Sequence, residues 1–328
     1  MKHHLKKYLE KNEIESEMIG RIVGETRLFY IVKSTEEDYK VYKRPEQQEY
    51  FVGDNVHLTL IDNQSYITKL FKRFNQVSKA RNQTSKSYNY SGEEKVLATN
   101  VDNVYIAIAA DQRFTIGKFE RYLLVFNQQK VNFEVIITKS DYFEKAQRIQ
   151  KEIKKYYPLI KIQFLSIFDN SIDQFRKSIF PESTSIILGS SGSGKSTLIN
   201  HLSKEFQLLT NEVRDDGKGK HTTTDICLIY LKETDSYFID TPGFKGINSH
   251  KELQYENLFD DIIDYSTKCK FNDCKHMKEP GCAVRKAIKS GKLSEEKLIR
   301  FHHYLEKELK RERYLKKQTL VKEKRTKS

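Results

Sequence analysis

The chain of 328 residues is long enough for two or three domains with buried cores, and its formal net charge at pH 7 is +13. An apolar fraction of 38%, with 19 Tyr and 19 Phe, excludes a chain that is disordered as a whole. So large a basic surplus favours an anionic partner, nucleic acid first, although a lysine-rich proteome would produce the same bias. The charged first residues and the absence of a long apolar run predict no signal peptide and no membrane partner, so we expect a cytoplasmic protein.

Short β-type segments separated by turn residues occupy the region from about residue 18 to residue 77. They lie at residues 21–23, 29–32, 56–60 and 66–70, with turn signals at Gly20, Gly24 and Gly53. Several short strands at this spacing predict a small β-barrel, which we assign to residues 1–77. The polar and basic stretch 79–87 that follows predicts a linker or a loop.

From about residue 100 the pattern changes to continuous apolar runs that alternate with helical stretches. The runs lie at 104–109, 133–137, 185–188 and 236–239, and the helical stretches lie at 118–127 and 142–157. A continuous apolar run is typical of a strand buried on both faces, and strands that alternate with helices predict a parallel α/β sheet. We assign this α/β domain to residues 78–248.

The strongest motif directly follows the apolar run that ends at Leu188, and it fits the pattern G-x-x-x-x-G-K-[ST] of a phosphate-binding loop. Its residues are Gly189, Ser190, Ser191, Gly192, Ser193, Gly194, Lys195, Ser196 and Thr197. Glycine lets backbone N–H groups curl around phosphate oxygens, and Lys195 would neutralise the β- and γ-phosphates during catalysis. Ser196 would bind Mg²⁺ through Oγ. A flexible Gly/Ser linker is the alternative, but the preceding strand and the spacing of Lys-Ser-Thr oppose it.

A second motif, Asp240-Thr-Pro-Gly243, follows the apolar run at 236–239 and predicts a switch next to the phosphates. Asp240 would hold Mg²⁺ through water, and the Gly243 N–H would face the γ-phosphate. One of the three threonines Thr222, Thr223 and Thr224 would complete the Mg²⁺ coordination, and we favour Thr223.

A guanine-reading motif follows the run at 133–137. Thr138, Lys139, Ser140 and Asp141 fit Asn-Lys-x-Asp except that Thr138 replaces the asparagine, which predicts weaker base affinity. The Asp141 carboxylate would accept from the ring N–H and the amine of guanine, which adenine cannot supply. The loop at Ser166 would add backbone N–H groups for the guanine carbonyl. The alternative is an ATP-using P-loop kinase in which Asp141 only begins a helix.

Three cysteines and a histidine lie close together in the C-terminal region, at Cys269, Cys274, His276 and Cys282. These are the ligands that a closed, tetrahedral, structural Zn²⁺ site requires, and unligated cysteines are the alternative. A long charged helix is expected from about residue 294, and its basic tail is either a solvated face or an arm that contacts RNA. We assign residues 249–328 to a mainly helical zinc-binding domain.

The base-reading motif precedes the phosphate-binding loop, although it follows that loop in an ordinary GTPase, so the motif order is circularly permuted. With the phosphate loop, His221-Thr-Thr-Thr224, the Asp240 motif and the cysteine cluster in this order, the chain resembles the ribosome-small-subunit-dependent GTPase A family (RsgA, also called YjeQ). The resemblance covers nearly the whole chain. It implies an N-terminal OB-fold, Mg²⁺-dependent GTP hydrolysis stimulated by the ribosome, and a late role in maturation of the small (30S) subunit with binding to its rRNA.

The residue that orients the attacking water is the least defined part of this site. Phe244 stands where many GTPases carry a water-orienting glutamine, and His221 is the nearest polar candidate for the catalytic group. In proteins that resemble this one, the corresponding histidine is the suspected catalytic residue. His221 as a loop residue or an RNA contact is the alternative. A nucleotide-gated RNA-binding module with incidental hydrolysis is the rival function, and we expect a monomer.

Overall fold

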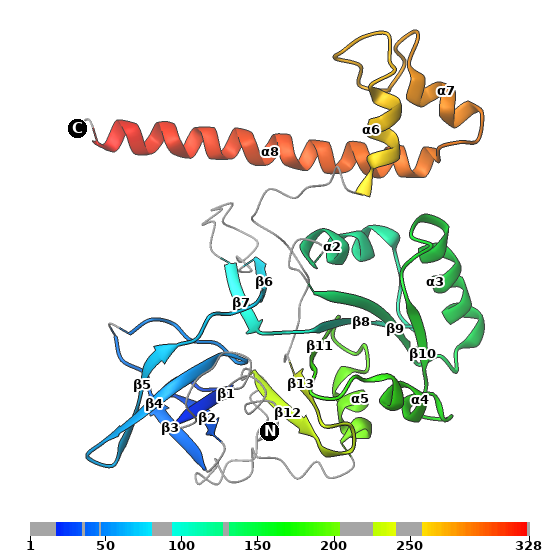
Figure 1. Ribbon diagram of the computed structural model, residues 1–328. Helices are drawn as coiled ribbons and strands as arrows, with labels where there is room; N and C mark the ends of the chain where they lie inside the picture. The colour runs from blue at the N-terminus through cyan, green and yellow to red at the C-terminus, as the bar shows by residue number, and fades with distance from the viewer. Residues whose placement is uncertain are drawn as a thin grey trace.

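The computed structural model describes residues 18–34, 37–45, 47–80, 94–126, 131–203, 226–240 and 258–326. A group of strands from the N-terminal region, a central α/β layer and a helical C-terminal region are its three parts (Figure 1). None of the helices within these described residues is long and apolar enough to cross a membrane.

Six strands form the central part of an 11-stranded sheet, in the order β10-β9-β8-β11-β13-β12, and the last of them pairs antiparallel with the N-terminal strand Ile19–Glu25. Their bounds are β8 (Asn103–Ala109), β9 (Asn132–Thr138), β10 (Ile162–Leu165), β11 (Thr184–Gly189), β12 (Cys227–Leu231) and β13 (Ser236–Asp240). All neighbouring pairs are parallel except β12 with β13. The strand before the phosphate-binding loop, β11, therefore lies in the middle of these six strands, between β8 and β13. This arrangement confirms the predicted parallel α/β sheet.

Alternate side chains along the strands pack into separate cores on the two faces of the sheet, because successive side chains of a strand point to opposite faces. Along β8, Val104 and Ile106 pack on one face, and Tyr105 and Ala107 pack on the other. The helices divide between the faces in the same way, with the first two on the Val104 side and the last two on the Tyr105 side. They are α2 (Ile116–Phe126), α3 (Phe143–Tyr156), α4 (Ser171–Ser178) and α5 (Lys195–Leu202). A short 3-10 helix, η1 (Lys232–Thr234), joins β12 to β13.

Five strands of the N-terminal region surround a core of their own. They are β1 (Ile19–Glu25), β2 (Phe29–Ser34), β3 (Asp38–Tyr42), β4 (Asn55–Ile61) and β5 (Gln64–Leu70). β1 pairs with both β2 and β4, β2 pairs with β3, and β4 pairs with β5. β3 and β5 lie side by side without a ladder, and Ile22, Val32, Val56 and Leu58 are fully buried between the strands. Four of the five strands were predicted from the sequence, and β3 was missed because its residues are mostly exposed and polar.

An antiparallel pair of strands, β6 (Gln76–Ala80) and β7 (Glu94–Thr99), lies between the five N-terminal strands and the central sheet (Figure 1). The first two residues of the expected linker, Lys79 and Ala80, belong to β6, and residues 81–87 lie outside the described residues.

The fully buried Arg21 of β1 holds these parts together. Its guanidinium donates to the carbonyl oxygens of Gly53 and Asn100 at 3.3 Å each and to Thr184 Oγ1 in β11 at 2.9 Å. Burial lowers the pKa of Arg21 to about 10, so the group stays charged at neutral pH.

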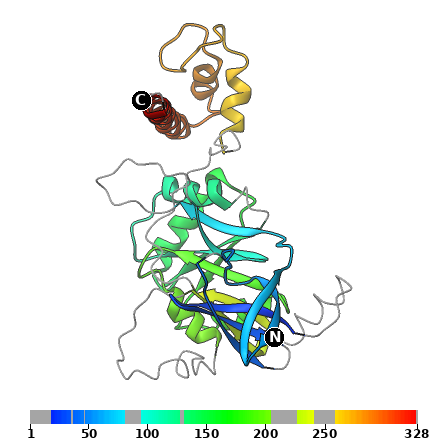
Figure 2. The same cartoon turned by 90° about the vertical axis from the view of Figure 1, so that its left-hand side faces the viewer.

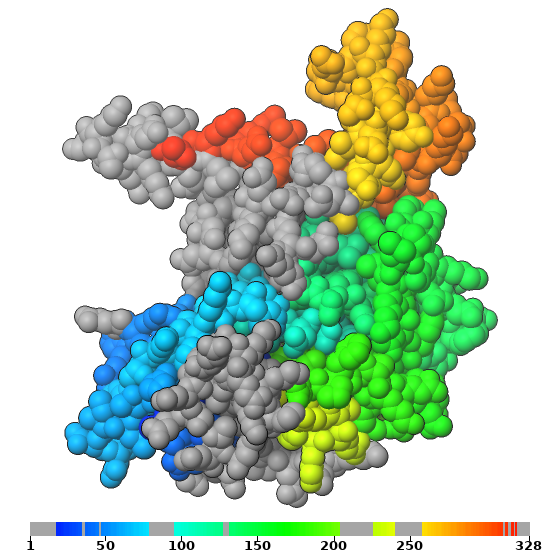
Figure 3. All heavy atoms as spheres, viewed as in Figure 1, coloured from blue at the N-terminus to red at the C-terminus, as the bar shows by residue number. Residues whose placement is uncertain are grey.

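The C-terminal region consists of three helices, α6 (Asp260–Ser266), α7 (Ala283–Lys289) and the long α8 (Glu295–Thr326). The last begins within one residue of the predicted start. Figures 1 to 3 show this region above α2 and α3, with α6 and α7 at one end of α8.

A buried ion pair joins this region to the central domain. Glu120 of α2 has no exposed surface and accepts from Arg300 Nε of α8 at 2.9 Å and from Tyr157 Oη at 2.8 Å. Burial raises the pKa of Glu120, and the positive charge of Arg300 acts in the opposite direction. The Arg300 guanidinium also lies 4.3 Å from the centre of the Tyr156 ring. These contacts anchor α8 to α2 and α3. Removing either partner of the ion pair would destabilise the protein, because the other charge would stay buried without a counter-ion.

Candidate functional site

The backbone fixes the shape of the phosphate-binding loop between β11 and α5. Gly192 and Gly194 have φ angles of +74° and +78°, which residues with a Cβ seldom adopt. Gly189 is needed for a different reason, because a Cβ there would lie 2.4 Å from the carbonyl oxygen of Ala107 in β8. The glycines are therefore at the positions where the fold requires them.

Lys195 begins α5 and its side chain turns back into the loop. Its Nζ donates to the carbonyl oxygens of Gly189 and Ser190, each at 2.9 Å, and the residue is mostly buried. Carbonyl dipoles bind an ammonium group less strongly than a fully charged phosphate does. A nucleotide phosphate can therefore replace the two carbonyl oxygens as the hydrogen-bond acceptor of Lys195. Ser196 and Thr197 lie exposed in the first turn of α5, where an Oγ is accessible to a metal ion.

Thr138, at the end of β9, connects the base-reading segment to the phosphate loop. Its Oγ1 donates to the Ser193 carbonyl oxygen at 2.8 Å, and Ser193 is completely buried. A Cβ on the neighbouring Gly194 would lie only 3.5 Å from the Thr138 Cβ. Threonine at this position therefore retains a hydrogen bond between the two motifs, although it lacks the second donor that an asparagine amide would offer.

Two side-chain contacts order the rest of the base-reading segment. Lys139 has a left-handed backbone, with φ +53°, and its Nζ pairs with Asp111 Oδ2 at 2.6 Å. Asp141 Oδ1 accepts from Ser166 Oγ at 3.0 Å, so the structure brings together the two loops that were predicted to read the base. The Ser166 N–H donates to Ser171 Oγ at 2.8 Å and is thus already used within its own loop.

A cavity of about 340 Å³ opens between these groups and lies within the range of roughly 300–1,000 Å³ that is usual for small-molecule sites. Its walls come from the segments after β8, β9 and β10 and from the start of α5. The lining residues are Asp111, Thr138, Lys139, Asp141, Tyr142, Leu165, Ser166, Ile167, Phe168, Ile172, Gly194, Thr197 and Leu198. A carboxylate and hydroxyl groups at one side, with apolar walls around them, suit a flat purine that carries polar groups on its edge.

The remaining predicted nucleotide residues are at or beyond the limit of the described chain. β13 ends at Asp240, just after the register pair of Ile186 in β11 with Ile239 in β13, so this residue lies at the phosphate-loop edge of the sheet. His221, Thr223 and Gly243 lie outside the described residues.

The sequence analysis missed two residues beside the nucleotide motifs, Asp111 and Gln112, and both lie in the loop after β8. Gln112 Nε2 donates to the Ser191 carbonyl oxygen at 3.0 Å, and Ser190 Oγ donates to Gln112 Oε1 at 2.8 Å. Asp111 pairs with Lys139 as described above. No motif marks these residues. The rule that carboxyl ends of parallel strands meet at one edge could have identified the loop, because β8 is the neighbour of β11.

The four predicted zinc ligands converge at the other end of the molecule. The ligand atoms of Cys269, Cys274, His276 and Cys282 all lie within 4.8 Å of one another. His276 Nδ1 is 3.6 Å from Cys269 Sγ and 3.5 Å from Cys282 Sγ, and the two sulfur atoms are 4.0 Å apart. Ligand atoms around a tetrahedral zinc are expected roughly 3.5–3.8 Å apart, given Zn–S near 2.3 Å and Zn–N near 2.0 Å. The donor set and its spacing therefore fit one Zn²⁺.

The pKa shifts differ among the four ligands, and burial raises the pKa of Cys274 to about 11. The pKa of Cys269 is lowered: burial opposes the thiolate, but hydrogen bonds from the backbone of Val284 and Ala283 outweigh it. Burial lowers the pKa of His276, which keeps its imidazole neutral and able to coordinate. Cys227 lies apart in β12 and takes no part in the cluster.

Comparison with known proteins agrees with this geometry. The family model of the RsgA GTPase matches residues 72–250. The chain is 32% identical over 297 residues to a small ribosomal subunit biogenesis GTPase RsgA of Xanthomonas axonopodis, a match that covers 86% of this chain and 78% of the relative. It is 29% identical over 299 residues to RsgA 2 of Vibrio parahaemolyticus, covering 90% and 80%.

Two solved structures share the fold. The circularly permuted GTPase YloQ matches with a TM-score of 0.58 and 24% identity, over 90% of this chain and 96% of that chain. YjeQ from Thermotoga maritima matches with a TM-score of 0.58 and 23% identity, over 88% and 98%. The permuted strand order of the central sheet is therefore a known architecture. The extent of the family match and the identity to its members show that this chain belongs to the RsgA GTPase family.

Proposed function

We propose that this chain is a Mg²⁺-dependent GTPase that acts in late maturation of the small ribosomal subunit and hydrolyses GTP faster when bound there. Membership of the RsgA GTPase family makes it a GTP-hydrolysing enzyme. The relatives it matches are named for biogenesis of the small ribosomal subunit, and the net charge of +13 suits an RNA partner. The observation that carries the proposal is the hydrogen-bonded connection from Asp141 and Ser166 through Thr138 to the phosphate loop. We further propose that the protein works as a cytoplasmic monomer.

We propose that guanine enters the cavity beside Asp141. The carboxylate accepts from the ring N–H and the exocyclic amine, and Ser166 Oγ holds the carboxylate in place. Lys139, fixed by Asp111, covers the base with its alkyl chain. Thr138 and Ser140 support the segment through Ser193 and the backbone of the neighbouring loop.

We assign hydrolysis to the phosphate-binding loop and to the segments that contain Thr223 and Asp240-Thr-Pro-Gly243. Backbone N–H groups of residues 189–197 surround the phosphates, and Lys195 gives its ammonium group to the β- and γ-phosphates. Mg²⁺, when bound, neutralises charge that develops on the phosphate oxygens, and Ser196, Thr223 and Asp240 are the residues that would hold it. The Gly243 N–H senses the γ-phosphate, and His221 orients the attacking water.

We propose one structural Zn²⁺ held by Cys269, Cys274, His276 and Cys282. Four protein ligands leave no open position, so the metal stabilises the fold of the C-terminal region and takes no part in the chemistry.

The barrel and the domain bounds complete the proposal. The pairing of β1 with β2 and β4, and the contact of β3 with β5, support an OB-type barrel, a fold that often binds RNA. We keep 1–77, 78–248 and 249–328 as the barrel, the GTPase domain and the zinc domain.

Nucleotide-dependent cosedimentation tests this function. The purified protein is centrifuged with small subunits, large subunits or naked RNA, in the presence of a non-hydrolysable GTP analogue, GDP or the matching ATP analogue. We expect binding to small subunits alone, strongest with the GTP analogue. Equal binding to both subunits, or equal support by the ATP analogue, would contradict the proposal.

A further inference from the structure

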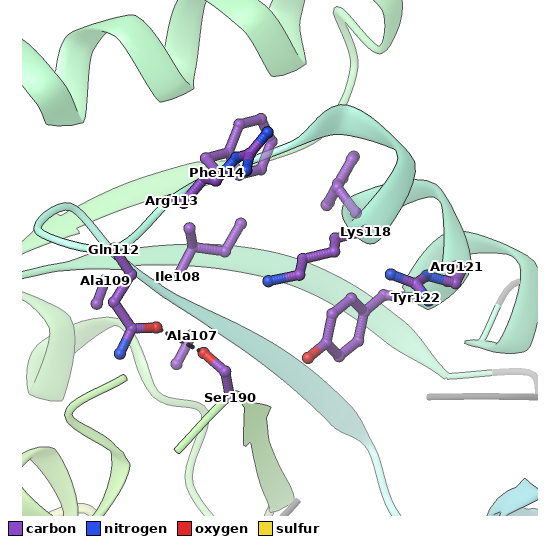
Figure 4. Close-up of a pocket in the computed structure, with 11 residues that line it drawn as sticks. Ala107, Ile108, Ala109, Gln112, Arg113, Phe114, Lys118, Arg121, Tyr122 and Ser190 are labelled. Carbon is purple, nitrogen blue, oxygen red and sulfur yellow. Dashed lines mark hydrogen bonds between the residues drawn. The ribbon is translucent and has the colours of Figure 1, made fainter. Parts of the chain in front are cut away.

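A second cavity lies on the other side of the phosphate loop from the guanine cavity. It has a volume of about 180 Å³ and is bounded by β8, the loop after β8, α2 and Ser190 (Figure 4). It is smaller than the roughly 300 Å³ at which pockets for drug-sized ligands begin, so it suits a group of the size of a phosphate.

The charges around this cavity all have one sign. Arg113, Lys118 and Arg121 line it, and none of its lining residues is acidic. Within the described residues, none of the three cations forms an ion pair. Figure 4 shows Lys118 extending from α2 across the cavity toward Ser190, with Arg121 beside the same helix next to Tyr122. Unpaired cations that share a concave surface favour an anion there.

A fourth cation adds to this positive region from the C-terminal helix. The pKa of Lys307 in α8 is lowered, first by burial and then by the positive charge of Arg121. Lys307 does not line the cavity, but its charge adds to the positive potential near Arg121.

One residue that lines the cavity also forms hydrogen bonds with the phosphate-binding loop. Gln112 lines the cavity and binds both Ser190 Oγ and the Ser191 carbonyl oxygen. A ligand that orders the side chains of this cavity would therefore also order the first half of the phosphate-binding loop, through the hydrogen bonds of Gln112.

We propose that this cavity binds a backbone phosphate of the RNA partner and so couples RNA docking to the phosphate-binding loop. The proposal rests on the proposed function, since it names the place where the ribosomal particle touches the GTPase domain. Arg113 and Lys118 are exposed side chains with long flexible stems, which is how proteins usually contact nucleic-acid phosphates. A site for a free small anion would instead use fixed, buried donors.

The test compares two double variants that lose the same charge. Arg113→Ala with Lys118→Ala removes two cations from the cavity. Arg148→Ala with Lys151→Ala removes one arginine and one lysine from the exposed face of α3 and serves as the control. Binding of each protein to small subunits is measured in the GTP-analogue state over a range of salt concentrations, and inorganic phosphate binding is measured by calorimetry. Affinity for the GTP analogue and the unfolding temperature confirm that both variants are folded.

We expect the cavity variant to bind small subunits about tenfold more weakly near 0.15 M salt, with a salt slope reduced by about one to two. The control should change neither value by as much. Equal losses in the two variants would overturn the proposal. So would loss of inorganic phosphate binding without loss of subunit affinity, because the cavity would then hold a free anion. If the wild-type protein itself does not bind small subunits, the proposed function fails rather than this assignment.

Discussion

The phosphate-binding loop and the cysteine–histidine cluster each come from one short stretch of sequence, but they are held in different ways. The loop is shaped by glycines with left-handed backbones and by hydrogen bonds from Thr138, Gln112 and Lys195. The cluster places four ligand atoms within 4.8 Å of one another, an arrangement that suits a cation between them. We therefore expect the loop to keep its form without a ligand, and the C-terminal region to depend on a bound metal ion.

The largest expected effect is at the cluster. Cys282→Ser should abolish stoichiometric zinc binding and unfold the region around α6 and α7, because structural zinc contributes roughly 10–16 kcal/mol to small zinc-binding folds. Zinc content by mass spectrometry and limited proteolysis measure this. Cys227→Ser is the matched control, since that cysteine lies in β12 away from the cluster. Full zinc content in Cys282→Ser would refute the ligand assignment.

Lys195→Ala tests the phosphate-binding loop. We expect kcat/KM for GTP to fall by about a hundredfold or more, as for the loss of one group that stabilises charge in the transition state. The unfolding temperature should change little, because the glycines and Thr138 keep the loop in place. Lys151→Ala, an exposed lysine on α3, should leave the rate unchanged. Collapse of the fold in Lys195→Ala would mean that the loop is not preorganised by its backbone.

Asp141→Asn should change which base is bound. Guanine loses two hydrogen bonds to a charged acceptor, worth roughly 1.5–3 kcal/mol each, so GTP affinity should fall at least about a hundredfold. Xanthosine triphosphate, which carries a carbonyl in place of the exocyclic amine, should gain affinity because the asparagine amide can donate to it. Equilibrium binding of both nucleotides decides the matter, and an equal loss for both would show that Asp141 does not read the base.

The smallest effect is expected at Thr138. Thr138→Val removes the hydroxyl that donates to Ser193 and should weaken GTP binding by about fivefold, corresponding to a hydrogen bond of roughly 1 kcal/mol. Thr138→Ser keeps the hydroxyl and should bind nearly as the wild type does. If both variants weaken binding alike, the methyl group rather than the hydrogen bond supports the site.

Much of this architecture could be predicted because its signals are local. The strand before Gly189, the loop itself and the spacing of the cysteines each lie within a short window. Arg21, Gln112 and the pair of Glu120 with Arg300 could not be predicted, because their partners are distant in the chain and become neighbours only in the fold. The β3 strand was missed for a related reason: its sequence is mostly polar, and its one buried side chain, Val41, shares a core with Val56 and Leu58, which lie farther along the chain.

The central claim is that the nucleotide site is a GTPase controlled by the small ribosomal subunit. The most direct test is the rate of GTP hydrolysis by the purified protein, alone and with small subunits, large subunits or naked RNA, with ATP as the parallel substrate. We expect slow hydrolysis by the protein alone and strong stimulation by small subunits, for GTP only. Fast unstimulated turnover, stimulation by naked RNA alone, or equal use of ATP would contradict it.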